Sequence, residues 1–136
     1  APYSLLRARD LMPCTVVCDL SQPRNTSPAL REERPDVLII DGGVIELPGT
    51  PDIGAYGPAG AGLAYACMAE TILWTLAGRT HSAGLGPRLP LQDLSELRGL
   101  ANRFGFKVAR VRSFESLLED DDFRRVAAFR PRRRTA

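Results

Sequence analysis

A cysteine and a glutamate stand three residues apart in the stretch LAYACMAET, residues 63–71. Cys67 is a candidate nucleophile, because the positive end of a helix favours the thiolate that attacks carbonyl carbons. Glu70 falls on the same helix face, where it can accept a proton or tether the helix to a backbone amide. A free cysteine also packs as a small apolar side chain, so both a catalytic and a structural interpretation of this pair stay open.

Three further side chains can take part in chemistry. His81 is the only histidine, and it is either a general acid near Cys67 or an exposed loop side chain. Asp19 and Asp41 each end a predicted strand. Ligands of open α/β sheets gather at the carboxyl ends of strands, but an aspartate there can equally cap the next turn. Gly42 follows Asp41 in the chain and permits either close backbone approach to a flat ligand or a sharp turn.

The composition is that of one globular domain. The 136 residues are 44% hydrophobic and 25% charged, and the formal net charge of +2 gives no chain-wide field for nucleic acid. The arginine-rich end, residues 123–136, is either a solvated tail or a phosphate-binding one. The three cysteines form no disulfide framework, which predicts reduced thiols and a cytoplasmic location. No apolar run reaches the roughly 18 residues that a membrane span needs.

The hydrophobic pattern alternates between strands and helices. Apolar β-branched runs predict strands over 14–21 and 36–43, joined by a crossover long enough for parallel pairing. Ser27 and Pro28 predict the start of a short helix. Helices are expected over about 60–77, apolar on all sides and therefore buried, over 91–104, and from about 113 onwards. A short strand is expected within 107–112.

This order predicts an α/β fold, the carboxyl-terminal half of a Rossmann-like doubly wound parallel sheet with trailing helices. Residues 1–112 form the predicted partial nucleotide-binding domain, and residues 113–136 form a terminal helix and basic tail. The glycine-rich stretch at 57–62 has the wrong spacing and position for the dinucleotide fingerprint. Because that fingerprint half is missing and the chain begins at Ala1, we expect a fragment of a longer enzyme.

Four stretches in a fixed order carry a resemblance: CTVVCDLSQPRN, VLIIDGGVIELPG, LAYACMAETILWTLAGR and LSELRGLANRFGFKVA. Over roughly residues 14–108 the chain resembles the carboxyl-terminal part of long-chain acyl-(acyl-carrier-protein) reductases, which form aldehydes. The resemblance implies that Cys67 takes the acyl group as a thioester, which NADPH then reduces. It also implies a nicotinamide pocket near Ser21, Pro23, Gly42 and Gly43.

The expected function is therefore that of a fragment of an NADP-dependent reductase, which converts a fatty acyl thioester to an aldehyde through a cysteine acyl-enzyme. The expected partners are an acyl-carrier-protein or acyl-coenzyme A thioester and the missing amino-terminal half, with no specific nucleic acid and no membrane span. Two alternatives stay open. One is a shikimate- or amino-acid-dehydrogenase-like oxidoreductase without covalent catalysis, and the other is a cofactor-free binding or scaffold remnant.

Overall fold

The computed structural model describes residues 5–80 and 90–130. Contacts within the chain divide it into two compact units, and each is considered by itself. Unit 1 combines residues 1–42 with residues 110–136, and unit 2 spans residues 43–109. The predicted boundary at residue 112 therefore falls inside unit 1. None of the helices in the described ranges is both long and apolar enough to cross a membrane.

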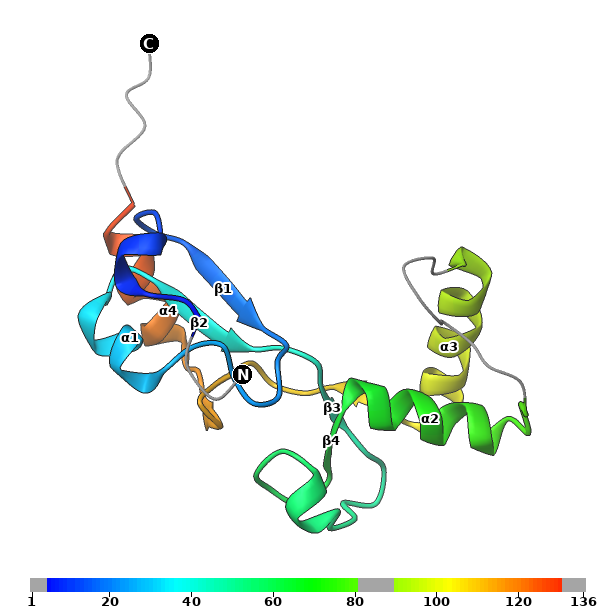
Figure 1. Ribbon diagram of the computed structural model, residues 1–136. Coiled ribbons are helices and arrows are strands. Elements are labelled where there is room, and N and C mark those ends of the chain that lie inside the picture. Colours follow the sequence, from blue (N-terminus) through cyan, green and yellow to red (C-terminus); the bar gives the residue numbers. More distant parts are fainter. Residues whose placement is uncertain (1–4, 81–89, 131–136) are drawn as a thin grey trace. The chain divides into compact units, whose positions relative to one another are not determined.

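Unit 1 is a four-stranded sheet with helices on its faces (Figure 1). Its strands have the order β1-β2-β6-β7, of which β1 and β2 are parallel and the other pairs antiparallel. The elements are η1 (Ala8–Asp10), β1 (Val16–Asp19), α1 (Pro28–Glu33), β2 (Leu38–Asp41), β6 (Arg112–Ser113), β7 (Ser116–Leu117) and α4 (Asp120–Ala128).

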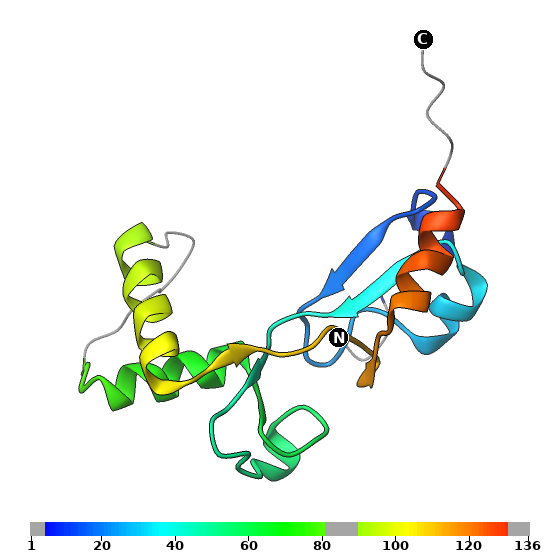
Figure 2. The same cartoon turned by 180° about the vertical axis from the view of Figure 1, so that it is seen from behind.

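The core of unit 1 follows from the alternation of side chains along β2. On one face, Ile39 packs with Leu30 of α1 in a buried cluster. On the other face, Leu38 packs with Val126 of α4. The predicted start of α1 is confirmed, since Ser27 is the N-cap and Pro28 is the first helical residue. Figure 2 shows β2 with these helices from the opposite side.

The fold class is confirmed as α/β, but the strands are not all parallel. A parallel pair, β1 and β2, lies where it was predicted. Beyond it the chain returns through a tight turn in which Phe114 and Glu115 have positive φ, so β6 pairs antiparallel with β2. The Rossmann-like doubly wound arrangement is not confirmed. Because this hairpin occupies residues 112–117, the last helix begins at Asp120 and not near residue 113 as predicted.

Unit 2 is a small antiparallel sheet with two helices. Its strand order is β4-β3-β5, with Ile45 of β3 opposite both Ala64 and Val108. The predicted helix over 91–104 is confirmed, and Gly105 ends it in the left-handed conformation. The elements are β3 (Val44–Glu46), η2 (Gly54–Tyr56), β4 (Leu63–Tyr65), α2 (Ala66–Leu76), α3 (Leu91–Phe104) and β5 (Lys107–Val108).

The helix predicted over about 60–77 differs from the observed α2 in two respects. It begins at Ala66, because residues 63–65 extend and pair with β3 as strand β4. It is also buried along one side only: Ala69 and Leu73 are covered, whereas Thr71 and Leu76 are exposed. Apolar residues on every side of a helix therefore did not mean burial on every side.

A partly buried arginine, Arg34, secures the chain that leads into β1. The Arg34 guanidinium donates to both carboxylate oxygens of Asp36 at 2.7 Å, and to the carbonyl oxygens of Ala8 and Leu11 at 2.6 and 2.8 Å. One of these two carboxylate oxygens, Oδ2 of Asp36, also accepts the Cys14 N–H at 3.2 Å. The hydrogen bond from Arg34 lowers the pKa of Asp36 to about 2, well below its ordinary value of 3.8.

Core packing in unit 1 gives the first prediction. Leu30 is only 3% exposed, so Leu30→Ala leaves a cavity and should cost roughly 2–5 kcal/mol of unfolding free energy. Leu20 is 71% exposed, so Leu20→Ala should change the unfolding free energy by no more than about 0.5 kcal/mol. Urea denaturation followed by circular dichroism measures both. Equal losses in the two variants would contradict the assignment of Leu30 to the core.

The second prediction concerns acid. Because the pKa of Asp36 is lower in the folded protein, its charged form stabilises the fold above pH 3.8, and this stabilisation is lost as the pH falls towards 2. Asp36→Asn lacks this stabilisation at every pH, so its melting temperature should be lower than that of the wild type at pH 7 and converge with it as the pH approaches 2. Thermal melts from pH 7 to pH 2 test this, with the exposed Glu32→Gln as control. If the melting temperatures of the wild type and Asp36→Asn differ by the same amount at every pH, the ionised Asp36 carboxylate does not stabilise the fold.

Candidate ligand-binding site

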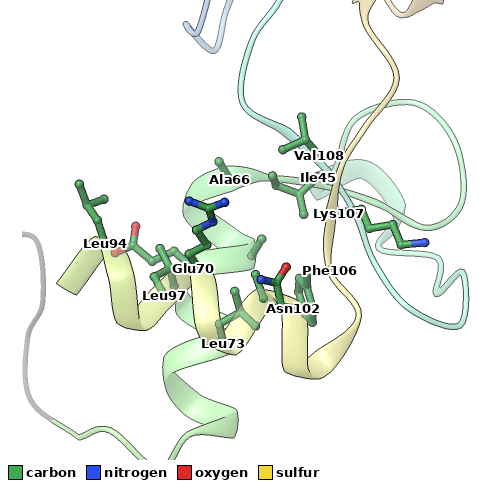
Figure 3. A pocket seen from close by; sticks show the side chains of 13 residues that line it. Ile45, Ala66, Glu70, Leu73, Leu94, Leu97, Asn102, Phe106, Lys107 and Val108 are labelled. Carbon is green, nitrogen blue, oxygen red and sulfur yellow. The ribbon is translucent and has the colours of Figure 1, made fainter. Parts of the chain in front are cut away.

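Unit 2 contains a cavity of about 550 Å³ between its two helices and its sheet (Figure 3). Helix α2 forms one wall with Ala69 and Leu73, and α3 forms another with Leu97 and Ala101. The full lining consists of Ile45, Ala66, Ala69, Glu70, Leu73, Leu94, Leu97, Arg98, Ala101, Asn102, Phe106, Lys107 and Val108. Most of these side chains are apolar, which is typical of sites for small organic molecules.

The sequence explains why space is left here. Three of the lining positions on the helices, Ala66, Ala69 and Ala101, carry only a methyl group, so the facing walls cannot fill the gap between them. After α3, Gly105 adopts φ +80°, a conformation that costs glycine little. This turn lets the Phe106 N–H donate to the Ala101 carbonyl at 2.9 Å and directs the buried Phe106 into the lining.

A polar network joins the end of α2 to the start of α3. The Trp74 indole N–H donates to the Glu70 carboxylate at 3.2 Å. The Arg79 guanidinium lies 4.2 Å from the centre of the Trp74 ring and pairs with Asp93 at 3.2 Å and with Glu96 at 3.3 Å. Cation–π contacts and partly shielded ion pairs of this kind hold side chains in one geometry. The walls of the cavity are thereby kept at a set separation.

Cys67 lies beside the cavity and does not line it. It is the second residue of α2 and is exposed, while Ala66 and Glu70 of the same helix belong to the lining. Gly43 lies close by, since its carbonyl oxygen accepts the Ala66 N–H at 2.7 Å. The Glu70 carboxylate binds the Trp74 indole, a tether to a side chain and not to a backbone amide. The catalytic roles of Cys67 and Glu70 stay predictions.

The other predicted cofactor residues belong to unit 1 and surround Asp19. The Ser21 N–H donates to the Asp19 carboxylate at 3.1 Å, and the Gly42 N–H donates to the Asp19 carbonyl at 2.9 Å. Pro23 lies in the same loop, after a cis peptide bond. A Cβ added to Gly42 would lie 2.6 Å from both the Cys18 sulfur and a methyl carbon of Leu20, so a larger residue there would have to displace these side chains. The cofactor roles of Ser21, Pro23, Gly42 and Gly43, and NADPH itself, stay predictions.

Asp19 caps the turn that follows its strand, as one of the two interpretations held. Its carboxylate accepts the backbone N–H groups of Ser21, Asn25 and Thr26 and the Thr26 hydroxyl. Burial by itself raises the pKa of Asp19, but these hydrogen bonds outweigh burial and lower the pKa below 3.8. Asp41 likewise accepts the N–H groups of Phe114 and Glu115. Both carboxylates are therefore engaged within the fold.

Several cavity residues were not anticipated from the sequence. Leu94, Arg98 and Asn102 follow one another at four-residue intervals on α3, so they share a stripe of the helix. This four-residue spacing is visible in the sequence, but it is also typical of an ordinary solvent-facing helix surface. Only the structure shows that α2 contributes the other wall of a cavity. His81 and the arginines at positions 132–134 lie outside the described residues.

Comparison with known proteins identifies a relative of part of this chain. No protein-family profile matches the chain. It is similar to Aminotransferase PigE of Serratia sp. (strain ATCC 39006), with 33% identity over 106 residues. The match covers 76% of this chain but only 12% of that protein. The chain thus spans about an eighth of the length of the curated relative that it matches.

This similarity corrects the function expected from the sequence. A relative named as an aminotransferase points to a function other than acyl-thioester reduction, so the prediction of a reductase fragment was wrong. The motifs that led to it are short apolar strands and an Ala-Cys helix start, which α/β proteins of different activities share. The resemblance to acyl-carrier-protein reductases as a family stays an untested prediction.

The network around the cavity gives the third prediction. Glu70→Ala removes the acceptor of the buried Trp74 indole N–H, which should cost about 0.5–1.5 kcal/mol of unfolding free energy and shift the indole emission. Glu70→Gln keeps an acceptor oxygen and should stay within about 0.5 kcal/mol of the wild type. Trp74 is the only tryptophan, so fluorescence reports on this site alone. An unchanged emission spectrum for Glu70→Ala would show that the hydrogen bond is not formed.

Proposed function

We propose that this chain is a ligand-binding segment of a longer protein related to Aminotransferase PigE, and that the α2–α3 cavity holds the apolar part of a small molecule. The observation that carries the proposal is the cavity itself, with its volume of about 550 Å³ and its mainly apolar lining. Ligand sites in proteins typically have volumes of about 300–1,000 Å³, apolar walls and a few polar groups.

The geometry of the walls supports ligand binding. Arg79 contacts Trp74 of α2 and pairs with Asp93 of α3, so the two helices are linked before any ligand arrives. A site that is already formed loses less conformational entropy on binding than one that must close. Ala69, Leu73 and Phe106 of the lining are packed in the apolar core of the unit, and Leu94 and Val108 of the lining are exposed apolar side chains that a ligand can contact.

We place binding, and not transamination, on this chain. Aminotransferases that use pyridoxal phosphate hold it through a lysine Schiff base, with an acidic or basic partner for the ring nitrogen. Lys107 is the only lysine in the sequence. In Figure 3 its side chain extends away from Glu70 and Asn102, so these groups do not form such a constellation. The amino-transfer chemistry implied by the relative's name is assigned, in this proposal, to other parts of the longer protein.

The fourth prediction tests the proposal with a neutral apolar probe, N-phenyl-1-naphthylamine. The wild-type chain should bind it saturably, with enhanced probe fluorescence and quenching of Trp74. Leu94→Glu places a charge on the cavity rim and should weaken binding at least about tenfold, which corresponds to ~1.4 kcal/mol.

Leu91→Glu is the matched control, because Leu91 is on the same helix, is 79% exposed and is not part of the lining. It adds the same charge and should bind the probe as the wild type does. Absence of saturable binding to the wild type, or equal weakening by the two variants, would rule out the cavity as the site. Circular dichroism confirms that both variants are folded.

A further inference from the structure

The rim of the cavity on α3 carries two polar side chains that the fold does not use. Arg98 and Asn102 both line the cavity and are exposed. Among the described residues, neither side chain has an ion pair or a side-chain hydrogen bond. Arg79, in contrast, is paired with Asp93 and Glu96.

These two side chains can act together. They are four residues apart on α3, so they project from neighbouring turns of one helix face. A guanidinium offers a planar set of N–H donors that fits carboxylate and phosphate oxygens, and an asparagine amide adds a further donor. Arg98 and Asn102 therefore provide hydrogen-bond donors for an anion at the mouth of an apolar cavity.

The charge balance of the lining agrees with an anionic ligand. The lining contains two cations, Arg98 and Lys107, and one carboxylate, Glu70. That carboxylate already accepts the Trp74 indole N–H, and Figure 3 shows it on the side of the cavity where Leu94 and Leu97 lie. The donors at the rim are thus in excess of the acceptors.

We infer that the ligand is an amphipathic anion, in which an apolar chain or ring ends in a carboxylate or phosphate group. Its apolar part lies against Leu73, Leu97 and Phe106, and its anionic oxygens bind Arg98 and Asn102. This inference rests on the proposed function, since it names the chemical class of the molecule that the cavity holds. Carboxylate and phosphate present the same oxyanion to the rim, and the experiment distinguishes them.

The test compares four ligands with the same eight-carbon chain: octanoate, octyl phosphate, octanol and octyltrimethylammonium. Calorimetry and Trp74 fluorescence measure their affinities for the full chain below the concentrations at which they form micelles. At least one of the two anions should bind about tenfold to a hundredfold more tightly than octanol, because a charge-assisted hydrogen bond is gained. The cation should bind least well, and the preference for the anion should shrink as salt is raised.

The variants identify the residue that recognises the anion. Arg98→Gln should abolish the preference of the anions over octanol while octanol itself still binds. Arg103→Gln removes the same charge from an exposed arginine of the same helix that is not part of the lining, and should keep the preference within about twofold. Both positions are exposed, so neither variant should unfold the protein.

The outcomes separate the two proposals. If octanol and the anions bind equally well, or if Arg103→Gln loses the preference and Arg98→Gln keeps it, the inference of an Arg98-bound anion is overturned while the cavity remains a ligand site. If neither the four ligands nor the neutral probe binds, the proposed function itself fails.

Discussion

The carboxylates at the ends of β1 and β2 hold unit 1 together, because the backbone N–H groups beyond these strands need acceptors. Asp19 accepts three backbone N–H groups of the loop at 21–26, and Asp41 accepts the N–H groups of Phe114 and Glu115. A buried N–H without an acceptor costs on the order of 1–3 kcal/mol. The Asp19 side chain therefore orders the loop that follows β1, and the Asp41 side chain orders the hairpin between β6 and β7.

This use of the aspartates bears on function. The carboxyl ends of parallel strands are where α/β proteins usually bind ligands. Here both carboxylates at that edge are occupied by the fold, and the Arg24 guanidinium also contacts Asp41 at 3.1 Å. A cavity lies in unit 2, where alanines on facing helices leave a space that no side chain of the described residues fills.

The similarity to Aminotransferase PigE concerns only a small part of that protein. The match covers 12% of that protein, so the name of the whole protein does not assign an activity to this segment. In the binding role proposed above, Trp74 and Arg79 contribute without lining the cavity, since their contacts link α2 to α3.

The sequence by itself determined the local elements. Ser27 and Pro28 predicted the start of α1, Gly105 predicted the end of α3, and β-branched runs predicted β1 and β2, because capping and strand propensity depend on neighbouring residues. Only the tertiary structure decided which strands pair and what surrounds each side chain. The antiparallel return of β6, the pairing that turns residues 63–65 into a strand and the apposition of α2 with Arg98 and Asn102 of α3 all join residues that are distant in sequence. Periodicity along the chain contains no information about such partners, and for that reason the candidate site could not be read from the sequence.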